Sequence, residues 1–218
     1  MDLIKLSSKE IEPNPIIIEA LKYINENSLF KDKIAKVLDI GAGDGMDSIF
    51  LVKNGFNVTA IDSSSYSIHK INQLAKIHAI TIKSAKFDAI TFPFETSRFV
   101  FAQPSCFSSR ASKSNLDGAQ EPEHAPDFSP RVLDNYDIII CINVLHLIKL
   151  EEATELIKKM KMYTSVGGMN IVSLYINDDS PLNNLESFYT DWKIIHLNKS
   201  FHKVKKNKIL LEFIAVKK

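Results

Sequence analysis

Cysteine is scarce in this sequence: only Cys106 and Cys141 occur among its 218 residues. Two cysteines without metal-ligand spacing around them predict neither a zinc site nor a disulfide framework. The first ten residues also lack the basic, apolar and small-residue regions of a secretory signal. We therefore expect no metal site and a reduced, cytoplasmic environment.

Excess charge of one sign and long apolar runs are also absent. The formal net charge is +1, so no global field attracts nucleic acid or an anionic membrane. No apolar run reaches the length needed to cross a bilayer. Four lysines do gather near the C-terminus, at positions 203, 205, 206 and 208. A solvated hairpin turn explains them more simply than a nucleic-acid surface, and we expect neither a nucleic acid nor a membrane as partner.

What the sequence does contain is an alternation of apolar runs and amphipathic segments. Gly167 and Gly168 predict a turn before the fifth strand. The alternation predicts an α/β fold with a doubly wound, mostly parallel seven-stranded sheet and a C-terminal antiparallel strand pair. The predicted strands are 36–40, 56–61, 79–83, 136–142, 169–176, 192–197 and 209–216. The predicted helices are 15–26, 46–54, 66–78 and 150–163.

One stretch, residues 98–131, differs from the rest in composition. It holds all three arginines of the chain, four of its eight prolines, one lysine and no isoleucine. A segment of this kind does not readily build a core strand or a long amphipathic helix. Residues 1–218 are therefore predicted to form a single domain with an inserted segment at about 98–131, and a substrate lid is the alternative interpretation of that segment.

The strongest chemical signal is the loop Asp39-Ile-Gly41-Ala-Gly43-Asp-Gly45, between a predicted strand and a predicted helix. Glycines let the backbone turn sharply and let a ligand approach closely, and the start of a helix offers unpaired N–H groups. Asp62 ends the second predicted strand, where its carboxylate can accept hydrogen bonds from both hydroxyls of an adenosine ribose. A cap for the next helix is its alternative role. Together the two features predict a nucleoside-binding site.

The spacing G-x-G-x-G differs from the dinucleotide fingerprint G-x-G-x-x-G. It resembles the first motif of the class I methyltransferases that use S-adenosylmethionine. Residues 58–62 resemble the second motif, residues 136–146 the fourth, and Gly167-Gly168 the turn into the fifth strand. The resemblance covers the chain outside 98–131 and implies a Rossmann-like methyltransferase fold with S-adenosylmethionine as cofactor. It implies that the cofactor-binding residues are Asp39, Gly41, Ala42, Gly43, Gly45, Asp62, Ser63, Asp88 and Asn143.

Asp88 follows the third predicted strand, where the family places an acid against the adenine amino group. The connection from Asp88 to Asp137 is far longer than the family's usual link between the third and fourth strands. Within the family, residues 44–51 and 54–62 look like the branch of tellurite-resistance and thiopurine methyltransferases.

The reaction that the resemblance implies is in-line displacement of a methyl group from a sulfonium, in which alignment supplies most of the acceleration. A small-molecule acceptor is expected: a thiol, a chalcogen oxyanion or an amine. His146, after the fourth predicted strand, is the candidate catalytic residue, and packing at the start of the next segment is its alternative role. Tyr175 and Asn177 are further candidates for the pocket wall.

Two other functions stay open. One is methylation of protein or RNA, for which the sequence shows no basic stripe with interleaved aromatic residues. The other is a cofactor-binding protein whose turnover is impaired because residues 98–131 obstruct the acceptor pocket.

Overall fold

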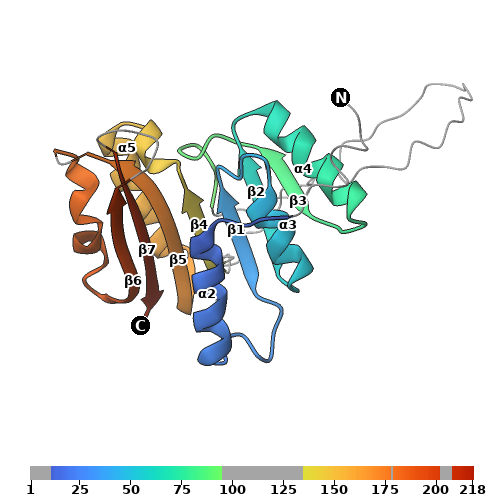
Figure 1. The fold of residues 1–218 in the computed structure, drawn as a ribbon, viewed down its shortest axis with the longest axis horizontal. Coiled ribbons are helices and arrows are strands. Elements are labelled where there is room, and N and C mark those ends of the chain that lie inside the picture. The colour runs from blue at the N-terminus through green and yellow to red at the C-terminus, as the bar shows by residue number, and fades with distance from the viewer. Residues whose placement is uncertain (1–10, 95–134, 178, 202–207) are drawn as a thin grey trace, which may run out of the picture.

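The computed structural model describes residues 11–94, 135–177, 179–201 and 208–218. The strands are β1 (Lys36–Ile40), β2 (Asn57–Asp62), β3 (Lys83–Lys86), β4 (Tyr136–Ile142), β5 (Thr164–Ile176), β6 (Trp192–Phe201) and β7 (Ile209–Lys217). The helices are α2 (Pro15–Glu26), α3 (Met46–Lys53), α4 (Ser65–Ile77) and α5 (Leu150–Met162), with the 3-10 segments η1 (Leu145–Leu147) and η2 (Pro181–Tyr189). The strands form one seven-stranded sheet in the order β3-β2-β1-β4-β5-β7-β6 (Figure 1). Strands β1 to β5 are parallel, and β7 runs antiparallel between β5 and β6, which confirms the predicted fold class.

Local sequence explains where two of the helices begin. The Asn14 side chain accepts a hydrogen bond from the N–H of Ile16, with 3.2 Å between the two atoms, and Pro15 occupies the first turn of α2. Proline suits that position because its missing N–H has no partner within the helix. The Ser64 hydroxyl accepts from the N–H of Ser67 at the start of α4.

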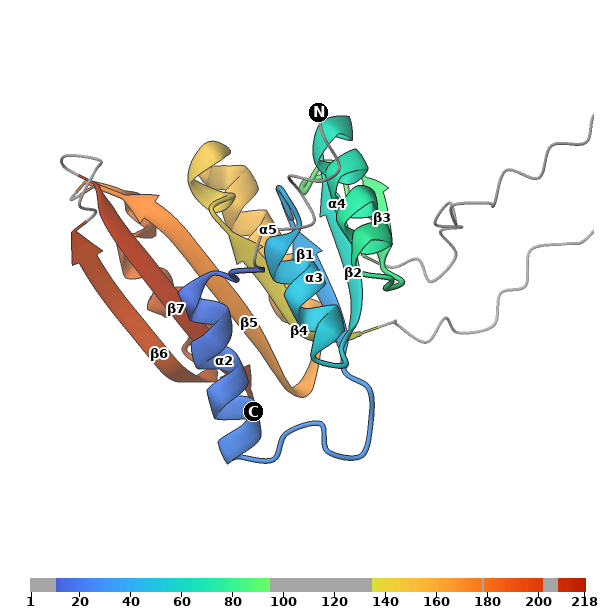
Figure 2. The same ribbon diagram turned by 45° about the vertical axis from the view of Figure 1, so that its right-hand side comes forward.

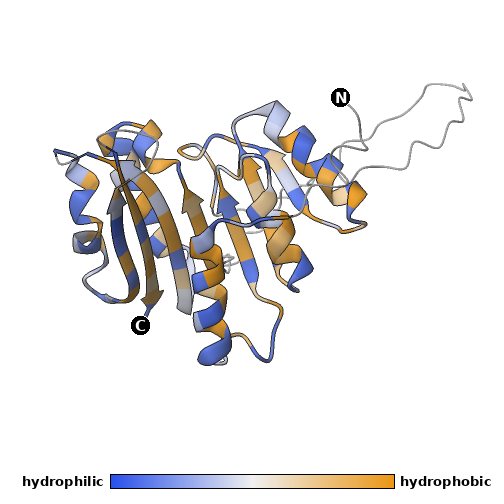
Figure 3. Ribbon diagram, viewed as in Figure 1, coloured by the Kyte–Doolittle hydropathy of each residue, from blue (hydrophilic) through white to orange (hydrophobic). Residues whose placement is uncertain are grey.

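The two faces of the sheet are covered by different helices. On one face, α2 and α3 lie over the strands, and on the other α5 and η2 do so (Figure 2). Alternate residues of each central strand point to opposite faces. The strand residues beneath α2 and α3 include Val37, Ile138, Ile140, Met169 and Ile171. Those facing α5 and η2 include Leu38, Ile40, Ile139, Cys141, Val172 and Leu174. The hydropathy colouring shows apolar residues both on the central strands and on the helices that cover them (Figure 3).

The third strand lies later in the chain than the predicted 79–83, because β3 spans Lys83–Lys86. Ala79 has a φ of +51°, and its N–H and that of Ile80 bond back to carbonyls in the last turn of α4. Ile80 and Ile82 pack with the apolar residues of α3 and α4. Their apolar pattern therefore reflects the end of a helix rather than a strand.

Gly167 and Gly168 lie inside β5 rather than in a turn before it, which corrects the prediction of a turn. Gly167 has a φ of +76°, and the register between β4 and β5 shifts between Tyr136 and Ile138. A Cβ at Gly168 would lie 2.6 Å from the carbonyl oxygen of Asp137. Gly167 therefore permits an irregularity in the strand, and Gly168 permits two backbones to approach closely.

The predicted antiparallel pair at the C-terminus is confirmed as β6 and β7. Trp192 is buried at the start of β6, and Cys141 is a buried free thiol in β4. The predicted inserted segment at 98–131 lies outside the described residues and stays a prediction. None of the helices that the structure describes is long and apolar enough to cross a membrane.

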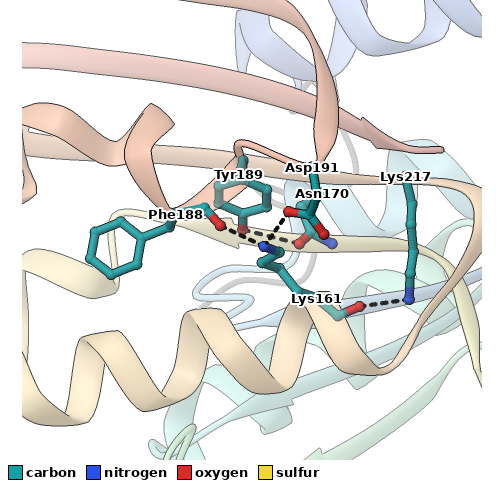
Figure 4. Close-up of polar contacts among 6 residues, drawn as sticks. All are labelled: Lys161, Asn170, Phe188, Tyr189, Asp191 and Lys217. Carbon is teal, nitrogen blue, oxygen red and sulfur yellow. Dashed lines mark hydrogen bonds and ion pairs between the residues drawn. The ribbon is translucent and has the colours of Figure 1, made fainter.

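A polar network joins several elements at the end of the sheet where the parallel strands begin (Figure 4). The Lys161 ammonium, near the end of α5, donates to the Asp191 carboxylate over 2.7 Å. The Lys217 ammonium, at the end of β7, donates to the carbonyl of Lys161 over 2.9 Å and so caps the last turn of α5. The buried Tyr189 hydroxyl donates to Asn170 Oδ1 over 3.0 Å. This network stabilises the end of the sheet at which the parallel strands begin, opposite their carboxyl ends.

Candidate functional site

A cavity of about 650 Å³ lies at the carboxyl ends of β1, β2 and β4. The strand order reverses direction at this point, because β2 lies on one side of β1 and β4 lies on the other. Open α/β sheets bind their ligands at such a point, and small-molecule sites typically measure roughly 300–1,000 Å³. The described residues that line the cavity are Asp39, Gly41, Ala42, Gly43, Asp44, Asp47, Asp62, Ser63, Phe87, Asp88, Ala89, Ile142, Asn143, Val144, Leu147 and Ile148.

The glycine loop has a backbone that side chains would disturb. The φ angles are +71° at Gly41 and +55° at Gly43, a region that residues with a Cβ rarely adopt. A Cβ at Gly41 would collide with the Val144 side chain, so this glycine permits the loop to pack against the chain after β4. A Cβ at Gly43 would have no other atom closer than 3.9 Å. The backbone at Gly43 is therefore open to a ligand in the cavity.

Asp62 joins this loop to the end of β2. Its Oδ2 accepts a hydrogen bond from the N–H of Gly43 over 2.9 Å, and its Oδ1 accepts from the N–H of Ser64 over 2.8 Å. A carboxylate has about four acceptor positions, so both oxygens can still accept bonds from a ligand. The alternative role of Asp62 as the cap of the next helix is wrong, because Ser64 caps α4 and Asp62 only orients Ser64. Its role toward a ligand stays a prediction.

Asp39 is a buried carboxyl group at the base of the cavity, with 3% of its surface exposed. The Ser48 hydroxyl donates to its Oδ2 over 2.6 Å. Burial raises the pKa of Asp39 to about 7, and the bond from Ser48 acts in the opposite direction. The nearby carboxylates of Asp47 and Asp62 add to the effect of burial, and the value of about 7 includes all of these contributions. A cation in the cavity would relieve this accumulation of negative charge.

Asn143 contributes an acceptor from the end of β4. Its backbone has a φ of +60°, and its N–H donates to the carbonyl of Ser173 over 2.7 Å. The side-chain Oδ1 is buried, and the described part of the chain offers it no hydrogen-bond partner. A buried acceptor without a partner is costly, so a ligand donor in the cavity would satisfy it.

Asp88 lines the cavity from the chain that follows β3. Its Oδ1 accepts a hydrogen bond from the N–H of Ile90 over 2.8 Å, which orients the carboxylate. The preceding N–H, of Phe87, donates to the carbonyl of Asp62 over 3.0 Å. The long connection after Asp88 has therefore not removed this acid from the cavity.

Two of the predicted site residues are not among the residues that line the cavity. Gly45 is buried against α4 and forms the start of α3. His146 lies in η1, where its Nδ1 accepts from the N–H of Tyr175 over 3.4 Å and its ring meets the Tyr175 ring edge-on. Tyr175 and Asn177 also lie outside the wall of the cavity. A role for His146 in catalysis stays a prediction.

The sequence interpretation does not identify several residues of the wall. Asp44 and Asp47 come from the end of the glycine loop and the first turn of α3. An acid in the first turn of the helix after a glycine loop indicates a residue of the binding site, because that turn faces the ligand. The apolar part of the wall comes from the chain after β4: Val144 lies within the fourth motif, whereas Leu147 and Ile148 lie beyond it.

Comparison with protein families gives a match over most of the chain. The family described as "Methyltransferase domain" matches residues 16–205. TehB of Haemophilus influenzae, described as a probable S-adenosyl-L-methionine-dependent methyltransferase, is 27% identical over 197 residues. The alignment covers 83% of this chain and 56% of TehB. The chain thus spans about half the length of the curated relatives that it matches.

Solved structures show the same fold. The crystal structure of TehB from Haemophilus influenzae aligns with a TM-score of 0.64 and 24% identity, over 94% of this chain and 62% of that chain. Magnesium protoporphyrin IX methyltransferase from Synechocystis PCC 6803, with bound S-adenosylmethionine, aligns with a TM-score of 0.61 and 14% identity. That alignment covers 93% of this chain and 78% of the Synechocystis chain.

Proposed function

Because the chain belongs to the methyltransferase-domain family, we propose that it transfers a methyl group from S-adenosylmethionine to a small-molecule acceptor. The family match and the relatives confirm the predicted class, the Rossmann-like fold and S-adenosylmethionine as the cofactor, and the likeness to TehB supports the predicted branch of tellurite-resistance and thiopurine methyltransferases. The acceptor belongs to the proposal: a thiol, a chalcogen oxyanion or an amine. A cytoplasmic location is part of the same proposal, supported by the scarcity of cysteine.

The cavity has the groups that this cofactor requires. Asp62 can accept bonds from the ribose hydroxyls, and the amino-acid end brings an ammonium with three donors to the region of Asp39 and Asn143. Five of the described lining residues are aspartates. The described lining contains no lysine, arginine or histidine. Such a wall favours a ligand that carries an ammonium and a sulfonium. The buried Oδ1 of Asn143 is the single observation that carries this proposal, since no described residue donates a hydrogen bond to it and the cofactor can supply a donor.

The protein's own contribution to the reaction is binding and alignment. When bound, the cofactor supplies an activated methyl group on a positively charged sulfur. The open backbone at Gly43 would let the ligand approach, and Asp62 and Asp88 would hold its nucleoside part. Val144 and Leu147 place apolar surface beside it and exclude water. Positioning of this kind provides most of the acceleration in a displacement with a good leaving group.

Calorimetry with S-adenosylmethionine tests the cofactor directly. We expect binding of S-adenosylmethionine and none of NAD, because the loop lacks the dinucleotide spacing. No heat with S-adenosylmethionine, together with binding of NAD, refutes the proposal.

A screen for methyl transfer then identifies the acceptor. Thiols, selenite, tellurite and small amines are incubated with cofactor labelled in the methyl group, and labelled product is measured. Transfer to one class assigns the acceptor. Cofactor binding without transfer to these acceptors, to protein or to RNA favours the alternative of a binding protein with impaired turnover. His146→Ala in the same assay tests whether that histidine takes part, because a packing role changes stability rather than turnover of the bound acceptor.

A further inference from the structure

Asp47 links the start of α3 to the chain that leads into α2. Its Oδ1 accepts a hydrogen bond from the N–H of Asn14, with 2.6 Å between the two atoms. The two residues are 33 positions apart. Asn14 also caps α2 through its side chain. Asp47 itself lines the cofactor cavity, so one carboxylate belongs both to the cavity wall and to the anchorage of α2.

The segment 11–14 has apolar anchors on both sides of this bond. Ile11 packs with the apolar residues of α3 and α4. On the other side, Ile16 and Ile17 in the first turn of α2 are buried against the sheet. Figure 2 shows the chain before α2 running toward the start of α3. The segment therefore crosses the beginning of α3, next to the glycine loop, and the bond to Asp47 lies between its two apolar anchors.

The surroundings of Asp47 make this bond important for the carboxylate. Burial raises its pKa, the charge of Asp44 raises it further, and the hydrogen bond from Asn14 lowers it. Asp44 in turn pairs with Lys70 across 3.3 Å. The N–H of Asn14 is thus the group that favours the charged form of Asp47 in a partly buried position.

We infer that Asp47 is a positioning residue for cofactor retention, which fixes segment 11–14 at the edge of the cavity through its bond to Asn14. The inference rests on the proposed function, because it takes the cavity as the cofactor site. The bond needs an acceptor oxygen at Oδ1 of residue 47, and it does not need a negative charge there. An asparagine at position 47 keeps such an oxygen, whereas an alanine does not.

The test compares three variants of the full-length chain by the affinity for S-adenosylmethionine and its dissociation rate. Asp47→Ala is expected to weaken binding by about tenfold through faster dissociation, because the N–H of Asn14 loses its acceptor. Asp47→Asn is expected to stay within about threefold of the parent. Glu19→Ala removes an exposed carboxylate from α2 and is the control with unchanged affinity.

Hydrogen exchange at the Asn14 amide gives a second readout. In the parent, bound S-adenosylmethionine should slow this exchange, and Asp47→Ala should accelerate it while Asp47→Asn should not. The inference is overturned if Asp47→Asn binds as weakly as Asp47→Ala, or if Asp47→Ala matches the parent. If Asp47→Ala does not fold, a measurement on the parent takes its place. In that case the inference is overturned if bound S-adenosylmethionine leaves the exchange rate of the Asn14 amide in the parent unchanged. A parent that fails to bind S-adenosylmethionine refutes the proposed function instead.

Discussion

The backbone N–H of Gly43 donates a hydrogen bond to the Asp62 carboxylate, with 2.9 Å between Gly43 N and Asp62 Oδ2. The two residues belong to different motifs and are 19 positions apart. The bond joins the loop after β1 to the end of β2, and the N–H of Ser64 orients the other oxygen of the same carboxylate. The acid proposed to bind the ribose and the glycine loop are therefore held in one arrangement by the protein's own hydrogen bonds.

Replacing Asp62 should damage both the ligand contact and the loop. We expect Asp62→Ala to weaken binding of S-adenosylmethionine by at least about tenfold, because hydrogen bonds to a charged group are lost. Asp62→Asn should also weaken it, since an amide NH₂ would face an N–H donor. Calorimetry measures both, with the exposed Asp32→Ala as a control. Parental affinity in a folded Asp62→Ala protein would contradict the assigned role.

Gly43→Ala should separate the effect on the cavity from the effect on the backbone. Gly55 is a matched position, because it has a φ of +89° and a Cβ there would meet no atom within 4 Å beyond its chain neighbours, yet it lies outside the cofactor cavity. Both substitutions should lower the free energy of unfolding by about 1–2 kcal/mol, the cost of a left-handed conformation. Only Gly43→Ala should also lower the affinity for the cofactor. Equal affinities in the two variants would show that Gly43 does not face the ligand.

Asp39 should make stability depend on pH. Its pKa is about 7 in the folded protein, against an ordinary value of 3.8. Between these values the folded chain holds a proton that the unfolded chain has released, so this group's contribution to stability falls as pH rises to about 7 and is constant above that. Asp39→Asn removes the cost of ionising a buried carboxyl group. It should therefore raise the free energy of unfolding at pH 8 by roughly 1–4 kcal/mol.

Denaturant titrations of parent and Asp39→Asn at several pH values measure this difference. It should shrink as pH falls from 7 toward 4, because the parent carboxyl is then neutral in the folded state. The variant should at the same time bind S-adenosylmethionine more weakly, since it cannot offer a negative charge to an ammonium. A difference in stability that grows as pH falls would contradict the burial of Asp39 in a neutral form.

Tyr189 should matter for stability and leave the cofactor site unaffected. Tyr189→Phe leaves the buried Oδ1 of Asn170 without the hydroxyl that donates to it, which should cost about 1–3 kcal/mol. Tyr23 offers a matched control, because its hydroxyl contacts Lys193 at the surface and Tyr23→Phe should cost little. Thermal unfolding and cofactor affinity are measured for both. Weakened cofactor binding in Tyr189→Phe would show that the two edges of the sheet are coupled.

Deletion of residues 98–131 tests the prediction of an inserted segment. Because its composition differs from that of the core, we expect the deletion to leave the thermal transition and the affinity for S-adenosylmethionine close to those of the parent. Differential scanning calorimetry and binding titrations measure the two quantities. Loss of the cooperative transition would show that the segment is part of the fold.

Most of the candidate site can be predicted, because its residues follow strand ends whose apolar patterns are clear. Gly41, Gly43 and Asp62 are predicted from their places after β1 and β2, and all three line the cavity. Asp47 is not among the predicted residues: its place in the first turn of α3 can be recognised in the sequence, but its contact with Asn14 cannot. The position of His146 after β4 predicts a place near the acceptor, yet its ring packs against Tyr175 of the neighbouring strand.

Local sequence is sufficient for the alternation of strands and helices, the position of the glycine loop and the acid at the end of β2. Each of these depends on periodicity and on residues close together in the chain. Three features become visible only in the folded chain: β3 begins at Lys83, Gly167 and Gly168 belong to a strand, and Asp39 is buried beside other carboxylates. The cause is that hydrogen-bonding partners across a sheet, burial and the pKa of a carboxyl group depend on residues distant in sequence, which folding brings together.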